Sequence, residues 1–175
     1  MNNEKHLIGR AEYVTFPELG INNVSARIDT GAKRSVIWVS KAEISRGGLH
    51  VIFLDKNEVG YTGETVIFDE YSRIAVASSN GHIDKRYAVK LQIKLGKRKI
   101  RATFTLANRS TQVYPVLIGR NILSGKFIVD VQAGQPQLKR EKERITELDN
   151  MLKKEDISWE LQSYQTETET TQQSV

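Results

Sequence analysis

An acidic residue at the end of an apolar segment is the first candidate for chemistry in this chain. Asp29 ends the alternating segment 24–28 and is followed directly by Thr30 and Gly31. A carboxylate beside a buried strand is costly unless it is hydrogen-bonded. Gly31 allows backbone N–H groups to approach the carboxylate closely, and the Thr30 hydroxyl can brace the loop. Because Asp-Thr-Gly is also a favourable turn sequence, the tripeptide alone leaves open both an acid–base site and a plain turn.

A second candidate segment lies much later in the chain. Residues 115–118 are apolar, Gly119 follows them, and Arg120 and Asn121 open a predicted short helix. This strand, glycine and basic–polar pair give the Asp-Thr-Gly segment a possible partner. The second segment therefore favours a functional loop over a plain turn at Asp29, provided that the fold brings the two segments together.

The elements that must position these segments are predicted to be strands throughout residues 1–136. The clearest signal is the alternation of apolar residues over 87–95 and 100–106, on both sides of the turn at Gly96. Alternation with a period of two predicts a hairpin with one buried face and one polar, basic face. Many short strands with regular turns predict an all-β class, a small barrel or a sandwich. Further strands are predicted around 24–28, 36–39, 51–54, 65–68, 73–77, 115–119 and 127–131.

The pattern changes after residue 136. Leu138, Ile145, Leu148 and Leu152 have helical spacing among charged residues, which predicts an amphipathic helix over 137–159. This helix could dock on the β domain or pair with a second copy of itself. Residues 160–175 are rich in Thr, Gln, Glu and Ser, and this composition predicts a disordered tail.

The distribution of charge favours an acidic partner. Residues 1–136 hold 20 basic and 12 acidic side chains, a net charge of +8, whereas residues 137–175 hold 6 and 9, a net charge of −3. A basic domain attracts nucleic acid, an acidic peptide or its own acidic tail, although scattered lysines also serve solubility alone. Aromatic residues do not alternate with basic ones on the exposed face of the predicted hairpin, so nucleic acid is not the expected partner.

Several kinds of site lack the residues that they need. Zero cysteines exclude disulfides and thiol nucleophiles, and His6, His50 and His82 are scattered without a His-Glu-x-x-His motif, so no metal site is predicted. No phosphate-binding Gly-x-x-x-x-Gly-Lys-Ser/Thr segment and no Gly-x-Ser-x-Gly segment occurs, so no cofactor is expected. The sequence has neither a membrane-spanning segment nor the pattern of an export signal, so we expect a cytoplasmic protein.

The Asp-Thr-Gly-Ala segment and the later Gly-Arg-Asn segment together resemble the single-domain aspartic peptidases called retropepsins. A closer resemblance, over about residues 7–136, is to a bacterial retropepsin-like family labelled "ATP-dependent zinc protease". Members of that family frequently accompany ATP-grasp glutamate ligases. The residues here give no support to the zinc in that label. The segments that carry the resemblance are 8–10, 16–20, 26–33, 79–82, 85–87, 106–109, 117–120 and 127–130.

The resemblance implies a fold and a mechanism. It implies a small closed β-barrel of retropepsin type, with six to eight strands over residues 7–136, followed by the C-terminal helix and the tail. Asp29, Thr30 and Gly31 would form the catalytic loop, in which Asp29 shares one proton with a second carboxylate about 3 Å away. Because the chain has a single Asp-Thr-Gly, the second carboxylate is expected from the other subunit of a homodimer. Gly119 and Arg120 would support the loop, Arg120 through an ion pair.

The resemblance and the basic domain together suggest an acidic substrate. Lys33 and Arg34 follow the Asp-Thr-Gly loop directly, and with Arg86 they are the candidates for binding an acidic peptide, such as a glutamate-rich tail made by a partner ligase. The expected function is an aspartic-type peptidase. The alternative is a non-catalytic adaptor of the same fold that regulates the ligase. The flap that would cover a substrate is not assigned, and its candidates are a hairpin within 47–63 and the turn at 78–82.

Overall fold

The computed structural model describes residues 4–77 and 83–172, with side chains described up to residue 155. Contacts divide the chain into two compact units, residues 1–136 and residues 137–175. The first unit holds all the described strands, so the chain is mostly β, as predicted. The division between the units lies where the sequence pattern changes.

The elements of the first unit follow one another with short connections. In chain order they are β1 (His6–Gly9), β2 (Ala11–Phe16), the 3-10 turn η1 (Pro17–Leu19), β3 (Ile21–Ile28), β4 (Ser35–Ser45), β5 (Gly48–Phe53), β6 (Thr65–Phe68), β7 (Ser72–Ala77), β8 (Ile83–Leu95), β9 (Arg98–Ala107), β10 (Val116–Ile118), α1 (Arg120–Leu123) and β11 (Phe127–Asp130).

The hairpin of β8 and β9 supplies much of the core. The chain turns at Gly96, which has a φ of 56°, a conformation that glycine adopts without steric cost. Apolar side chains at alternate positions of both strands are buried, and the ring of Phe104 packs edge-on against that of Phe16 on β2, with centroids 5.2 Å apart. The opposite face carries exposed Lys90 and Arg101. The predicted hairpin, with one apolar and one basic face, is confirmed.

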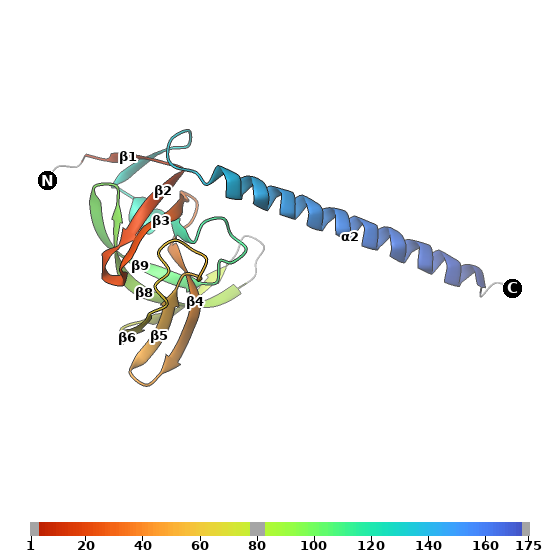
Figure 1. The fold of residues 1–175 in the computed structure, drawn as a ribbon, viewed down its shortest axis with the longest axis horizontal. Helices are drawn as coiled ribbons and strands as arrows, with labels where there is room; N and C mark the ends of the chain where they lie inside the picture. Colours follow the sequence, from red (N-terminus) through yellow and green to blue (C-terminus); the bar gives the residue numbers. More distant parts are fainter. Residues whose placement is uncertain (1–3, 78–82, 173–175) are drawn as a thin grey trace. The chain divides into compact units, whose positions relative to one another are not determined.

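Six strands close a ring of backbone pairings. β3 pairs antiparallel with β2, β2 with β8 and β8 with β9, whereas β9 pairs in parallel with β4. β10 closes the ring, because it pairs antiparallel with β4 and in parallel with β3. Figure 1 shows the strands of this unit curving around one interior, with the β4–β5 hairpin extending away from it. The structure thus shows the predicted all-β class, with a ring of strand pairings in the first unit.

Two further strand pairs extend from the ring. β1 pairs in parallel with β11, so both ends of the first unit lie in one small sheet. β7 pairs antiparallel with the first part of β8, and the connection at 78–82, one of the two flap candidates, lies outside the described residues.

The second unit contains the helix α2 (Leu138–Gln172). The helix begins next to the predicted start but continues past residue 159, where we predicted that order ends. The predicted disordered tail at 160–175 is therefore helical as far as Gln172, and residues 173–175 lie outside the described part. Neither glycine nor proline occurs after Pro136, so no residue stops the helix. No helix in the described residues is both long and apolar enough to cross a membrane.

Candidate active site

Asp29 lies directly after β3, where the chain leaves the ring and enters a loop. Its carboxylate oxygen Oδ1 accepts hydrogen bonds from the backbone N–H groups of Gly31, at 2.9 Å, and Ala32, at 3.0 Å. The side chain is half-buried, and its other oxygen, Oδ2, accepts no hydrogen bond from any described residue. Two N–H donors therefore orient the carboxylate and leave one oxygen for other partners.

β10 supports this loop from the next position in the ring. The N–H group of Asp29 donates to the Ile118 carbonyl at 2.9 Å, and that of Arg120 donates to the Ala32 carbonyl at 2.8 Å. A Cβ atom added to Gly119 would lie 2.6 Å from the carbonyl oxygen of Arg34, so the two backbones approach too closely for any other residue. The structure thus places Gly119 directly against the loop that begins with Asp29.

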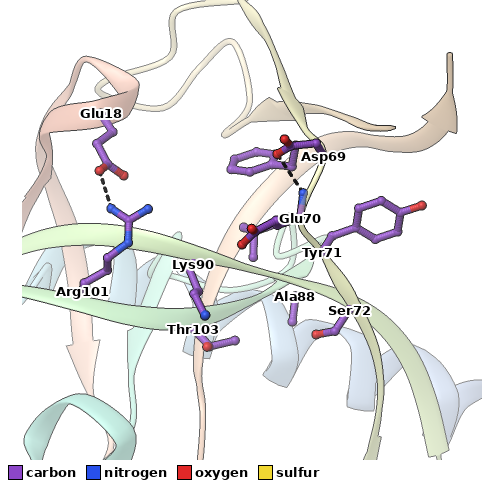
Figure 2. A pocket seen from close by; sticks show the side chains of 11 residues that line it. Glu18, Asp69, Glu70, Tyr71, Ser72, Ala88, Lys90, Arg101 and Thr103 are labelled. Carbon is purple, nitrogen blue, oxygen red and sulfur yellow. Dashed lines mark hydrogen bonds and ion pairs between the residues drawn. The ribbon is translucent and has the colours of Figure 1, made fainter. Parts of the chain in front are cut away.

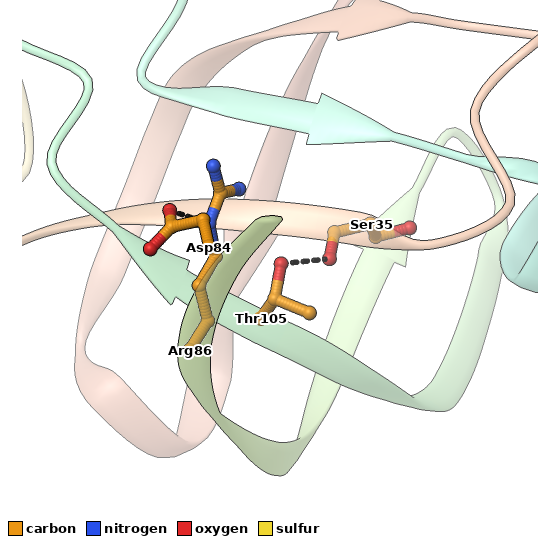
Figure 3. A network of polar contacts seen from close by, with 4 residues as sticks. All are labelled: Ser35, Asp84, Arg86 and Thr105. Atoms are coloured by element: carbon orange, nitrogen blue, oxygen red, sulfur yellow. Dashed lines mark hydrogen bonds and ion pairs between the residues drawn. The ribbon is translucent and has the colours of Figure 1, made fainter. Parts of the chain in front are cut away.

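Ser35, the first residue of β4, links the end of the loop to the segment after β10. Its buried hydroxyl accepts a hydrogen bond from the Gly119 N–H at 2.9 Å and donates one to Asn121 Oδ1 at 2.8 Å. Its backbone carbonyl accepts a hydrogen bond from Thr105 Oγ1 on β9 at 3.2 Å, as Figure 3 shows. Asn121 Nδ2 in turn donates to the Thr103 carbonyl at 2.9 Å. This network fixes the Gly-Arg-Asn segment to two strands of the ring.

The side chains around the loop differ in part from what we predicted. Thr30, Lys33 and Arg34 are exposed, and their side chains make no hydrogen bond or ion pair with any described residue. Bracing of the loop by the Thr30 hydroxyl is therefore not seen among the described residues. Arg120 Nη1 donates to the Gly31 carbonyl at 3.1 Å. Among the described residues Arg120 forms no ion pair, so it supports the loop through the backbone instead of a carboxylate.

Arg86 reaches the site from the β7–β8 hairpin, where it pairs with Ile74. Its Nε donates to Asp84 Oδ2 at 2.7 Å, and Figure 3 shows the two side chains together. The Arg86 side chain is half-buried. Its charge acts on Arg109, a residue beyond the end of β9 that also interacts with Asp29.

Arg109 is not among the site residues that we predicted. Its Nε donates to the Tyr114 carbonyl at 2.9 Å. The pKa of Arg109 is lowered from 12.5 to about 10, first by burial and then by the positive charges of Arg86 and Arg27, while the negative charge of Asp29 acts in the opposite direction. These interactions relate three arginines and Asp29, from three separate parts of the chain, to one site.

Only one signal in the sequence could have pointed to Arg109. It lies in 106–109, one of the segments that carry the family resemblance. Charge alone does not distinguish it from the other basic residues, of which the chain has 26 with Arg109 included. Its place beside Asp29 depends on the parallel pairing of β4 with β9, which the sequence pattern does not specify.

Metal ligands do not gather in the part of the chain that the structure describes, where no group of three or more His, Asp or Glu side chains could hold an ion. His50 Nε2 lies 2.9 Å from the Arg46 carbonyl in the β4–β5 hairpin. The His6 ring lies near that of Phe127. His82 lies outside the described residues.

A cavity of about 620 Å³ lies apart from these residues. Figure 2 shows its walls, with the ion pair of Glu18 and Arg101 on one side and Asp69 and Glu70 on another. It mixes acidic and basic side chains and includes none of the predicted site residues, so it is separate from the site at Asp29. The residues that line it are Glu18, Phe68, Asp69, Glu70, Tyr71, Ser72, Ala88, Val89, Lys90, Arg101 and Thr103.

Comparison with known proteins relates the first unit to one family. The model of a family described as RimB-like, "Retropepsin-like aspartic endopeptidase RimB", matches residues 7–140. A crystal structure of a protein of unknown function from Legionella pneumophila is similar with a TM-score of 0.47 and 22% identity, over 75% of this chain and 97% of that one.

The curated relatives are much longer than this chain. A protein of Shewanella halifaxensis named "Probable alpha-L-glutamate ligase" is 33% identical over 134 residues, which are 74% of this chain and 29% of that protein. A protein of Desulfotalea psychrophila with the same name is 31% identical over 134 residues, 72% of this chain and 28% of that protein. The chain thus spans less than a third of the length of these relatives.

Proposed function

Because the chain belongs to the RimB-like family of retropepsin-like aspartic endopeptidases, we propose that it is an aspartic-type peptidase that hydrolyses a peptide bond through paired Asp29 side chains. The observation that carries this proposal is the orientation of Asp29. Gly31 and Ala32 hold Oδ1, while no described residue donates to Oδ2. The ring of strand pairings, with β10 beside the Asp29 loop, supports the finer assignment of a closed retropepsin-type barrel.

The mechanism requires two carboxyl groups that share one proton. Two such groups about 3 Å apart cannot both ionise, so one remains protonated. The ionised group takes a proton from water, which attacks the carbonyl carbon, while the other group donates its proton to the carbonyl oxygen. The C–N bond then breaks as the group that took the proton from water gives it to the leaving nitrogen. The other group takes back a hydroxyl proton as the new carboxyl group forms, so the pair again shares one proton. Each loop supplies one carboxylate, Asp29, so we propose a homodimer in which each subunit contributes its own.

The proposed substrate is an acidic, glutamate-rich peptide. Lys33 and Arg34 are exposed and follow Asp29 in the chain. Arg86 is half-buried, and its charge acts on Arg109, as that of Asp29 does. Positive side chains around a site raise the local concentration of an anionic substrate. The curated relatives are named glutamate ligases, so we propose an ATP-grasp glutamate ligase as the functional partner and its product, made in the cytoplasm, as the substrate.

A second candidate is a non-catalytic adaptor that regulates such a ligase. The observation that favours it is the name of the relatives, which describes ligation and not cleavage. An adaptor needs the shape and charge of this surface but not the acid–base function of Asp29.

Substitution Asp29→Asn separates the two functions. The amide keeps an oxygen that can accept from Gly31 and Ala32, so the loop is retained while the ionisable group is lost. We expect cleavage of a glutamate-rich peptide to fall about 10³-fold or more. A matched control is Asp130→Asn, because Asp130 Oδ1 accepts from the Gln132 N–H in the same way, at 2.8 Å, but lies at the end of β11.

The outcomes exclude one function or the other. Loss of cleavage in Asp29→Asn, with full cleavage in Asp130→Asn, supports the peptidase. Equal cleavage by Asp29→Asn and the unsubstituted chain would refute it. If the chain cleaves nothing, and both it and Asp29→Asn change the activity of the ligase equally, the adaptor is supported.

A further inference from the structure

Arg109 lies within electrostatic reach of Asp29 and of two further arginines. Arg27, which is exposed, lies on β3 two residues before Asp29. Arg86 lies two residues before Ala88, which pairs with Thr105 on β9. Arg86 comes from β8, and Arg109 follows β9. The positive charges of Arg86 and Arg27 and the negative charge of Asp29 all act on Arg109. The four side chains therefore form one electrostatic cluster.

Two of these arginines are held by the protein through Nε, the inner nitrogen of the guanidinium group. Arg109 uses Nε to bond the Tyr114 carbonyl, and the turn around it is closed by the Gln112 N–H bonding the Arg109 carbonyl at 2.8 Å. Arg86 uses Nε to bond Asp84. Within the described residues, the terminal nitrogens of Arg86 and Arg109 have no hydrogen-bond acceptor. Two terminal N–H groups in one plane match the two oxygens of a carboxylate.

The cluster holds more positive than negative charge. Three guanidinium groups are accompanied by Asp29 and by Asp84, which is already paired with Arg86. Arg86 and Arg109 are half-buried, and burial beside like charges is unfavourable for Arg109. Groups kept in such an environment are commonly functional, because a bound anion restores the balance of charge.

We propose that Arg109, together with Arg27 and Arg86, binds a carboxylate group of the substrate beside Asp29 and thereby selects the peptide bond that is cleaved. This inference rests on the proposed function for its substrate, but it assigns specificity to residues that the loop itself does not contain. Lys33 and Arg34, which are exposed and have no described partner, would attract an acidic chain without fixing its register.

The carboxylate has two possible sources in a peptide. It can be the side chain of a glutamate next to the scissile bond, or the free carboxyl group at the C-terminus of the peptide. The first source selects internal bonds between acidic residues. The second selects bonds close to the C-terminus. Both sources present the same planar group to Arg109.

The test measures binding and cleavage separately. In the full-length chain carrying Asp29→Asn, which can bind but not hydrolyse, Arg109→Gln is expected to weaken the binding of a short glutamate peptide about ten- to hundredfold. The charge-matched control is Arg46→Gln in the β4–β5 turn, whose side chain contacts no described partner. It should change the affinity less than about twofold. Arg109→Lys keeps the charge but not the planar pair of donors and should recover only part of the affinity.

Three peptides identify the source of the carboxylate: the glutamate peptide, the same peptide with a C-terminal amide, and its glutamine counterpart with a free C-terminus. Binding lost in the amide but kept in the glutamine peptide assigns the terminal carboxylate, and the reverse assigns the side chain. The proposal is overturned if Arg109→Gln binds the glutamate peptide as tightly as its parent, if no acidic peptide binds the parent, or if the amide and glutamine peptides bind the parent as tightly as the glutamate peptide does. Arg109-dependent binding in a chain that cleaves nothing would refute the proposed peptidase but keep this subsite. Cleavage that Arg109→Gln leaves unchanged would keep the proposed peptidase but refute this subsite.

Discussion

At the scale of single residues, Ser35 determines how the Asp29 loop and the Gly-Arg-Asn segment are joined. Its hydroxyl is fully buried, and it accepts from Gly119 while donating to Asn121. A buried N–H group without an acceptor costs more than the net value of the bond that it had formed. The position of the loop therefore depends on a residue that takes no part in the proposed chemistry.

Substitution Ser35→Ala should lower the free energy of unfolding by about 1–3 kcal/mol, because it leaves the Gly119 N–H and Asn121 Oδ1 without their partner. Denaturant titration measures this change. The control is Ser40→Ala on the same strand, where the exposed hydroxyl only bonds the Ile52 carbonyl at 3.4 Å. That substitution should cost less than about 0.5 kcal/mol. Equal costs at the two positions would show that the Ser35 network contributes nothing to stability.

At the scale of the elements, the sequence predicted best the strands that bury one face in the core and expose the other. The alternation over 87–106 correctly predicted both strands of the β8–β9 hairpin, their turn and their basic face. It did not single out β1 and β2, because β1 has too few residues for a period of two to be distinct. Nor could it give the parallel pairings of β10 with β3 and of β9 with β4, since these bring together segments that are far apart in the chain.

The same limit explains which site residues could be predicted. Asp29 and Gly119 were identified because their neighbours in sequence are distinctive. Arg109 was not identified, because the role that we propose for it depends on its position in space, and this follows from the pairing of β9 with β4. Bracing by the Thr30 hydroxyl is not seen among the described residues and stays a prediction, because a hydroxyl in an exposed loop needs a partner that the sequence pattern does not reveal.

Gly119, which directly follows β10, allows the backbone there to lie close to the Asp29 loop. Substitution Gly119→Ala places a Cβ atom 2.6 Å from the Arg34 carbonyl oxygen and 2.9 Å from that of Ala32, so β10 and the loop must separate. We expect a loss of about 1–3 kcal/mol of stability and a fall in peptide cleavage of about tenfold or more, since Asp29 shifts with the loop.

Gly125→Ala is the matched control for this change. Gly125 has a φ of 73° and no atom close to an added Cβ, so alanine there costs about 1 kcal/mol through backbone strain alone. Cleavage should be unchanged in that variant, measured as kcat/KM on the same peptide. A Gly119→Ala variant with unaltered cleavage would mean that the close approach of β10 does not position Asp29.

At the scale of the whole molecule, positive charge is concentrated at the candidate site. Residues 1–136 contain 20 basic side chains. Five of them gather at or beside the Asp29 loop: Arg27, Lys33, Arg34, Arg86 and Arg109. Against them the loop itself presents a single carboxylate. A peptide with several acidic groups balances this charge, but the hydrolysis that we propose needs a second carboxylate that one chain does not supply in this loop.

Mixing active and inactive chains tests whether that second carboxylate comes from another copy. If each active unit needs two Asp29 side chains, a dimer of one unsubstituted and one Asp29→Asn chain is inactive. In an equal mixture that has exchanged subunits, about a quarter of the dimers keep both carboxylates, so total cleavage falls to about half of that given by the same amount of unsubstituted chain alone. Asp130→Asn chains, mixed in the same proportion, should instead add activity. Sedimentation at the assay concentration shows whether dimers are present and exchanging. Cleavage that stays constant as Asp29→Asn chains are added would exclude the paired mechanism and require the second proton-transfer group to come from within one chain.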